Sequence, residues 1–269
     1  MRIPRRTALG WLGTLALGRF RPAAAQTAQP ASVVAHASGD DIAREAERVN
    51  QGFVTERSAL TLILTSAHGD RTERRLSLEI REDEAQGNQT RIDFEWPENV
   101  RGTILLTHAR KVGDDEQWLY LPSAGRVRRV SAGQQAGSFM GSEFTYEDLT
   151  PTVAAKYTHT RMADDTADGR PCFALERRPR GDASGYSRER LWLDKERMVP
   201  IMVEFYDRKN ELLKVATYRD YLTFGRYHRA ALVRMENRQT RRISELKTQG
   251  RQLGIKLDAL RFRSQALGR

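Results

Sequence analysis

Residues 117–149 read QWLYLPSAGRVRRVSAGQQAGSFMGSEFTYEDL, and a change of pattern inside this stretch decides the fold that we predict. Up to residue 130 the stretch contains two candidate strands on either side of a Pro-Ser-Ala-Gly turn. From residue 131 to residue 151 the strand pattern stops, and a glycine-containing loop carries three large apolar residues: Phe139, Met140 and Phe144. Such side chains are not expected to face water, so we expect this loop to lie on, or to cover, an apolar surface.

Most of the chain beyond Gly52 has the composition and spacing of strands, with apolar and polar residues alternating most clearly at residues 76–80 and 92–96. The candidate strands are residues 60–64, 76–80, 92–96, 103–109, 117–121, 126–130, 156–162, 172–177, 187–193, 200–206, 211–221, 230–237 and 241–247. Residues 236–251 also fit a surface helix. The connections are short and rich in turn residues, so they have no room for helical crossovers between parallel strands. The sequence therefore predicts an antiparallel meander of about a dozen strands.

One amphipathic helix is predicted before the strands. Ser38 and Asp41 have the spacing of a capping box, apolar residues then repeat at helical spacing, and Gly52 is the expected stop. A single helical turn is also expected at residues 145–149. Since a sheet this long usually curls, the predicted fold class is mainly β (α+β): a large, incompletely closed antiparallel barrel with capping helices on its concave side. No break in composition divides residues 38–269, which we expect to form a single domain.

The first 25 residues have the three zones of an export signal: a basic start, an apolar stretch of ten residues and a cluster of alanines ending at Ala25. We expect a cleaved signal peptide at residues 1–25, a disordered tail at residues 26–37 and a periplasmic location, reached by the Sec or the twin-arginine route. The apolar stretch is too short to cross a bilayer. Five arginines lie in this segment, so cleavage lowers the formal charge from +10 to +5, which argues against a nucleic-acid partner.

Neither the cysteine nor the histidines indicate catalysis or metal binding. Cys172 is the single cysteine, so an internal disulfide is impossible, and we interpret its side chain as buried. The five histidines have no metal-ligand spacing, and no nucleophile elbow occurs. Glu147 and Asp148 are adjacent, so on a helical turn their carboxylates point about 100° apart instead of flanking a substrate. We predict a protein that is not an enzyme and that has no metal or cofactor.

Three segments taken together resemble a known family. WLYLP at residues 118–122, RVRRV at 126–130 and SFMGSEFTYEDL at 138–149 are similar to the outer-membrane lipoprotein-sorting (LolA-like) proteins. The family commonly has Asp where this chain has Glu143 and Ser where it has Thr145. The resemblance implies an unclosed antiparallel barrel, capped by helices, that shelters lipid or acyl chains in transit through the periplasm.

From this resemblance we expect a periplasmic carrier of lipid, lipoprotein acyl chains or another hydrophobic cargo for transfer across the envelope. An apolar sleeve suits this task, because each methylene of an acyl chain costs about 0.8 kcal/mol when it is exposed to water. The alternative is a non-enzymatic periplasmic interaction module of a transporter of the resistance-nodulation-division type. Such an inner-membrane transporter is also the expected partner of a carrier, which would be soluble and contact membranes transiently.

The candidate ligand-binding residues are the strand aromatics, expected on the concave side, and the apolar residues of the loop: Phe94, Trp96, Trp118, Tyr120, Trp192, Phe205, Phe139, Met140, Phe144 and Tyr146. Tyr218 is a further aromatic expected on the concave side. For each strand aromatic the alternative is ordinary core packing, and the loop is either a movable lid or a core plug.

A basic strip is the candidate for contact with lipid headgroups or with an acidic partner: Arg126, Arg128 and Arg129. The alternative for this strip is a solvated strand face whose arginines pair with Glu147 and Asp148.

Overall fold

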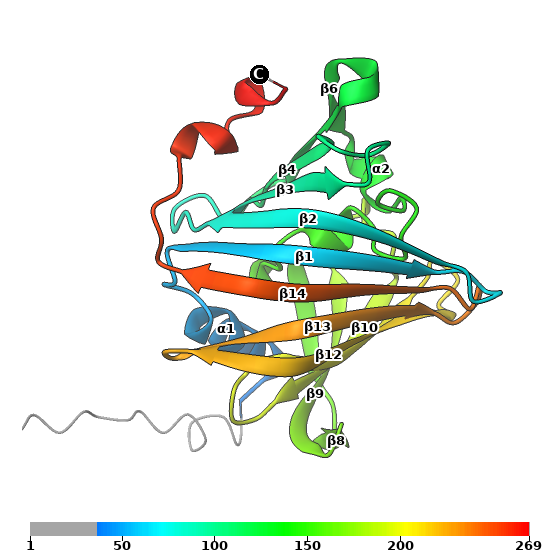
Figure 1. Cartoon of the computed structure of the whole chain (residues 1–269). Coiled ribbons are helices and arrows are strands. Elements are labelled where there is room, and N and C mark those ends of the chain that lie inside the picture. Colours follow the sequence, from blue (N-terminus) through cyan, green and yellow to red (C-terminus); the bar gives the residue numbers. More distant parts are fainter. Residues whose placement is uncertain (1–36, 269) are drawn as a thin grey trace, which may run out of the picture.

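A computed structural model describes residues 37–268, and nearly half of them belong to one antiparallel sheet that curves around a helix and a long loop (Figure 1). The strands are β1 (Thr55–Thr65), β2 (Arg71–Arg81), β3 (Gln89–Trp96), β4 (Ile104–His108), β5 (Glu116–Leu121), β6 (Arg126–Val130), β7 (Tyr157–Arg161), β8 (Asp165–Ala167), β9 (Arg170–Pro179), β10 (Arg188–Asp194), β11 (Pro200–Tyr206), β12 (Leu212–Phe224), β13 (Tyr227–Asn237) and β14 (Ile243–Leu253). Every candidate strand read from the sequence overlaps one of these. Residues 236–251 are strand and turn, so the helix alternative is wrong.

The sheet consists of two meanders joined in the middle. The strand order is β6-β5-β4-β3-β2-β1-β14-β13-β12-β11-β10-β9-β7, and β8 pairs with β9. The first and the last strand therefore lie side by side, from Glu56 opposite Leu253 to Thr65 opposite Ile243. The predicted meander is found within each half, but the join between β1 and β14 was not predicted, because it pairs segments that are far apart in the sequence.

Strands β6 and β7 are the two unpaired edges of the sheet, so the barrel is incompletely closed, as predicted. Residues 131–156 connect these two edges and lie on the inner side of the curved sheet (Figure 1). This segment, called the crossing loop below, contains the short helices α2 (Ala132–Gln135), η2 (Glu147–Leu149) and η3 (Ala154–Lys156). The end of the strand pattern at residue 131 therefore marks the place where the chain crosses from one edge of the sheet to the other.

Helix α1 (Gly39–Val49) packs against β7 and η3. Its predicted capping box is confirmed: the Ser38 hydroxyl accepts from the Asp41 amide at 3.2 Å, and the Asp41 carboxylate accepts from the Ser38 amide at 3.2 Å. The helix ends at Val49, before the expected stop at Gly52. Asn50 is its C-cap, and the Asn50 side chain donates to a carbonyl of the last helical turn at 2.9 Å and to one in the β10–β11 connection at 3.0 Å.

The alternation along the strands divides the apolar side chains between two faces. The inner face carries a large buried cluster that includes Leu62, Leu76, Phe94, Leu105 and Leu175. On the outer face, a smaller cluster is covered by the C-terminal segment, which contains η4 (Ala259–Phe262) and η5 (Ser264–Ala266). This smaller cluster consists of Ile104, Leu106, Phe262 and Leu267, with Trp118, Tyr120 and Leu257 packed against it.

The remaining short helix, η1 (Pro122–Ala124), forms the turn between β5 and β6. Between residues 37 and 268 no helix has the length and apolarity needed to cross a bilayer. The predicted signal peptide and all but the last residue of the predicted tail lie outside the described residues.

Candidate ligand-binding site

The apolar residues of the crossing loop point toward the concave face of the sheet. Phe139 and Phe144 are 2% and 4% exposed. The ring of Phe139 lies 5.6 Å from that of Phe94 on β3 and 5.5 Å from that of Tyr146, measured between centroids. The sequence therefore predicted correctly that this loop lies on an apolar surface.

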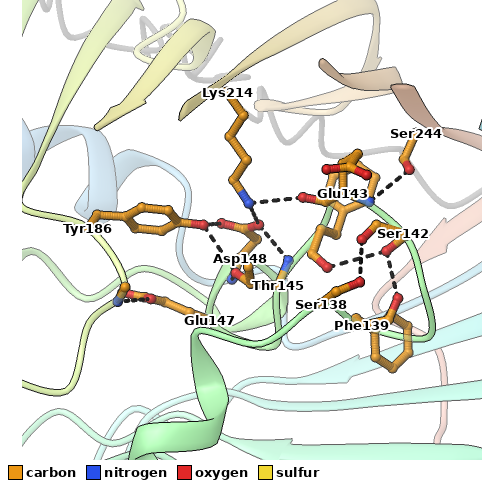
Figure 2. A network of polar contacts seen from close by, with 12 residues as sticks. Ser138, Phe139, Ser142, Glu143, Thr145, Glu147, Asp148, Tyr186, Lys214 and Ser244 are labelled. Carbon is orange, nitrogen blue, oxygen red and sulfur yellow. Dashed lines mark hydrogen bonds and ion pairs between the residues drawn. The ribbon is translucent and has the colours of Figure 1, made fainter. Parts of the chain in front are cut away.

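Polar contacts hold the loop in a compact turn against the sheet (Figure 2). The Ser138 hydroxyl donates to the carbonyl of Ser142 at 2.6 Å, and the Ser142 hydroxyl donates to the carbonyl of Phe139 at 2.7 Å. The backbone amide of Glu143 donates to the Ser244 hydroxyl on β14 at 2.9 Å. Small hydroxyl residues in this segment thus satisfy backbone groups that would otherwise be buried without partners.

Asp148 connects the loop to the second half of the sheet through a buried ion pair. Its Oδ2 lies 2.5 Å from Nζ of Lys214 on β12, and the two side chains are 4% and 2% exposed. Oδ1 accepts from the Tyr186 hydroxyl at 2.7 Å (Figure 2). Lys214 also donates to the carbonyl of Glu143 at 2.9 Å. These partners offset the cost of removing both charges from water.

Glu147 fixes the loop to the β9–β10 connection. Its carboxylate accepts from the Gly185 amide at 3.0 Å and from the Ser184 hydroxyl. Burial raises the pKa of Glu147. Because Glu147 and Asp148 have these partners, they do not pair with the basic strip, and that part of the alternative for the strip is wrong.

A hollow of about 360 Å³ lies between the crossing loop and the strands β1 to β3. Its walls are mostly apolar, and Leu78 and Ile80 are only partly buried because they face this space. Its apolar lining consists of Phe53, Leu60, Leu62, Leu76, Leu78, Ile80, Ile92, Phe139, Phe144, Leu149, Pro151 and Leu246. The polar side chains that reach it include Glu56, Thr90 and Arg229. The volume is within the range of sites for small apolar ligands.

A second hollow of about 720 Å³ lies toward strands β9 to β13. It has polar and apolar walls, the former including Tyr157, Arg177, Glu189 and Tyr218. Six residues border both hollows and so separate them: Phe144, Asp148, Leu149, Thr150, Pro151 and Leu246. The end of the crossing loop is therefore the wall between an apolar and a partly polar space.

The predicted ligand-binding residues fall into three groups. Phe139 and Phe144 line the first hollow, and Phe144 and Phe205 line the second. Three further residues belong to the same inner core or pack on it: Phe94, Met140 and Tyr146. The carbonyl of Met140 accepts from Arg74 on β2, which adds a contact between loop and sheet.

Four aromatics are not where the prediction placed them. Trp118 and Tyr120 lie on the outer face, against the C-terminal segment, and Trp192 lies on the outer face with its Nε1 donating to Asp165 at 2.9 Å. Trp96 is 42% exposed. The composition of these strands shows that one face is buried, but it does not show which face is concave. Their expected position on the concave side is therefore wrong, whereas the position of Tyr218 is correct.

The basic strip is part of the edge strand β6. Its three arginines are exposed, and Arg129 forms an ion pair with Glu116 at 3.1 Å. Arg128 lies near the hydroxyl of Tyr146. A contact of Arg126, Arg128 and Arg129 with headgroups or with a partner stays a prediction.

Sequence reasoning did not single out most of the aliphatic lining. Leu78, Ile80 and Leu246 are ordinary strand residues whose importance depends on the curvature of the sheet. The alternation signal that identified 76–80 as a strand already put Leu78 and Ile80 on one face, and the pairing with the neighbouring strands makes that face the inner one. In the part of the chain that the structure describes, no group of three or more His, Cys, Asp or Glu side chains is placed to hold a metal ion.

Three solved structures are similar to this chain in fold. A domain of an outer membrane lipoprotein-sorting protein from Vibrio parahaemolyticus is 37% identical, with a TM-score of 0.84, over 86% of this chain and 98% of that chain. A DUF1329 family protein from Desulfovibrio piger is 23% identical, with a TM-score of 0.81, over 85% of this chain and 97% of that one. A LolA superfamily protein from Nitrosomonas europaea is 16% identical, with a TM-score of 0.68, over 85% and 99%.

The open antiparallel barrel with its covered concave face is therefore the fold of the LolA-like proteins. A family model with the description "-like: Uncharacterized protein" matches residues 86–269, and no curated protein matches the chain. Since a solved domain that is 37% identical covers 86% of this chain, the chain belongs to the outer-membrane lipoprotein-sorting (LolA-like) family, as the resemblance in residues 118–149 predicted.

Proposed function

We propose that this protein is a periplasmic, non-enzymatic carrier that shelters the apolar part of a lipid, a lipoprotein acyl chain or another hydrophobic cargo during transfer across the envelope. One observation carries the proposal: the hollow of about 360 Å³ with mostly apolar walls beneath the crossing loop. Each methylene that moves from water into such a space gains about 0.8 kcal/mol. Membership in the lipoprotein-sorting family supports this class of cargo, and the three zones of an export signal in residues 1–25 support the location.

The cargo would be held without a covalent bond. Aliphatic side chains from β1 to β3 and the rings of Phe139 and Phe144 would surround the chain, and the crossing loop would move to admit it. Handover to an inner-membrane transporter of the resistance-nodulation-division type stays a prediction, because the three similar structures described above give no indication of such a partner.

The test is uptake of a fluorescent long-chain acyl probe by the purified chain without residues 1–25, together with native mass spectrometry of protein from the periplasm. A Leu78→Phe variant fills part of the hollow. The loss of space for about one methylene predicts binding that is weaker by roughly fourfold. The matched control is Val112→Phe, at a side chain that is 91% exposed, which should bind like the unchanged protein.

Absence of both probe uptake and co-purified lipid would contradict the proposal. If the protein then bound an envelope transporter in a cross-linking experiment, the interaction module would be the better interpretation. Equal binding by Leu78→Phe and Val112→Phe would show that the probe binds elsewhere.

A further inference from the structure

The second hollow is lined by polar groups that have no hydrogen-bond partner among residues 37–268. On its wall Nη2 and Nε of Arg177 donate to Oε2 of Glu189 at 2.6 and 3.1 Å, and the two side chains are 12% and 2% exposed. Within residues 37–268, Nη1 of Arg177 and Oε1 of Glu189 have no hydrogen-bond partner. The hydroxyls of Tyr157 and Tyr218 also line the hollow, and they too have no hydrogen-bond partner within residues 37–268.

These four side chains come from four strands and form one cluster. Tyr157, Arg177, Glu189 and Tyr218 belong to β7, β9, β10 and β12, and the guanidinium carbon of Arg177 lies 4.6 Å from the centre of the Tyr157 ring. Burial raises the pKa of Tyr218 to about 12, so its hydroxyl carries a proton at neutral pH. The cluster therefore offers donors and an acceptor. Tyr157 and Tyr218 are only partly buried, so these atoms face the open space of the hollow, where a bound molecule can supply their hydrogen-bond partners.

The charges around this hollow are largely balanced. Two ion pairs border it, Arg177–Glu189 and Asp115–Lys156, and Asp148, which also borders it, pairs with Lys214 behind the wall. Two further positive side chains, Lys111 and Arg180, and one negative side chain, Asp114, also line this hollow. An anionic group inside would lie close to Glu189 and Glu147, and a cationic group would lie close to Arg177. Burying an uncompensated charge costs several kcal/mol, so this space favours an uncharged polar group.

The cluster is adjacent to the apolar hollow. The two spaces share the end of the crossing loop and Leu246 as their common wall. The walls of the second hollow also include apolar side chains, Phe205, Val233 and Met235. A molecule with an acyl tail and a polar end therefore matches the two spaces better than a pure hydrocarbon does.

We propose that the second hollow is a subsite for an uncharged, hydroxyl-bearing head, and that the cargo is an amphiphile of the acylglycerol type whose tail occupies the apolar hollow. A head hydroxyl donates to Oε1 of Glu189 and accepts from Nη1 of Arg177, and the hydroxyls of Tyr157 and Tyr218 bond to further oxygens of the head. This inference rests on the carrier function proposed above and specifies its class of cargo.

The experiment compares three competitors with one tail length for displacement of the fluorescent acyl probe: 1-palmitoylglycerol, methyl palmitate and palmitate. The unchanged protein should bind 1-palmitoylglycerol most tightly. The double variant Tyr157→Phe/Tyr218→Phe loses no internal hydrogen bond from either hydroxyl, so it should fold normally. It should bind 1-palmitoylglycerol about fivefold more weakly for each hydroxyl removed, and methyl palmitate with unchanged affinity.

The matched control is Tyr206→Phe, which removes a hydroxyl that donates to Glu204 at 2.7 Å on the outer face. It should leave all three affinities unchanged. Equal affinity for the three competitors, tightest binding of palmitate, or an unchanged preference in the double variant would each overturn the head subsite while leaving the carrier function in place. Failure of the probe and of all three competitors to bind would overturn both proposals.

Discussion

Asp148 shows how one side chain can join three segments of this molecule. Its carboxylate accepts from Lys214 on β12, from the Tyr186 hydroxyl and from the backbone amide of Thr145 at 2.7 Å. The sequence identified Glu147 and Asp148 as unsuited to paired acid catalysis, and the structure gives each acid a fixed set of partners. The sequence did not reveal Lys214 as the partner of Asp148, because an ion pair between residues 66 positions apart leaves no local signal.

Removing one member of this buried pair should destabilise the fold strongly. Lys214→Met leaves the Asp148 carboxylate buried beside one hydroxyl and one amide, so we expect the free energy of unfolding to fall by about 3–5 kcal/mol, measured by urea denaturation. Lys195→Met is the matched control: Lys195 pairs with Asp164, their side chains are 35% and 36% exposed, and its loss should cost less than about 1 kcal/mol. Similar losses in the two variants would contradict this account.

His108 should make stability depend on pH. Burial lowers the pKa of this side chain below its ordinary value of 6.5, and its Nε2 lies 2.7 Å from the carbonyl of Phe262. As the pH falls below 6.5 the unfolded chain takes up the proton first, so the free energy of unfolding decreases until the lower folded pKa is reached. Burial lowers the pKa of His159 and His228 as well, so the variant His108→Gln should reduce this slope without abolishing it.

Urea denaturation from pH 8 to pH 5 measures this dependence. The slope attributable to one histidine cannot exceed about 1.4 kcal/mol per pH unit. An unchanged slope in His108→Gln would show that this side chain takes up its proton equally in the folded and the unfolded chain.

At the scale of elements, local signals predicted the strands and the helix but not their partners. Alternation identified β2 and β3, and the capping box at Ser38 identified α1. Strand β8 is only three residues long and was missed, since no periodicity can show in so short a segment. Trp118 and Tyr120 were wrongly placed on the concave face, because the outer face of β5 is covered by a C-terminal segment whose short 3-10 helices have no readable pattern.

This C-terminal segment should contribute to the stability of the sheet. Phe262 is 2% exposed in the outer cluster, and Arg261 forms ion pairs with Glu79 at 2.8 Å and with Asp93 at 3.3 Å. Phe262→Ala should lower the free energy of unfolding by about 3 kcal/mol and increase quenching of Trp118 fluorescence by iodide. Leu260→Ala, at a side chain that is 54% exposed, is the control and should change neither quantity.

At the scale of the whole molecule, the family resemblance and the curling of a long sheet predicted an open barrel, and the structure agrees. The two hollows were not predictable, because their volumes depend on how far the crossing loop lies from the sheet. If the crossing loop is a movable lid, it must move before cargo can enter. If it is a core plug, it stays in place during entry.

A cross-link between loop and sheet distinguishes these two roles. The backbone amide of Glu143 and the hydroxyl of Ser244 are 2.9 Å apart, so the two segments lie close together, and we expect Glu143→Cys/Ser244→Cys to form a disulfide on oxidation, checked by thiol titration. If the loop is a lid, the oxidised variant should take up the acyl probe far more slowly, and reduction should restore the rate. Equal uptake before and after reduction would identify the loop as a plug. Cys172 is fully buried and should not interfere.

A sheet that stops short of closing leaves backbone donors and acceptors of β6 without partners, and such an edge invites a neighbouring molecule to extend the sheet. The guanidinium groups of Arg126, Arg128 and Arg129 lie along this edge, so two copies that approach through it bring like charges together. Charged side chains on an edge strand oppose such pairing, so this row of arginines disfavours association of two copies through the open edge.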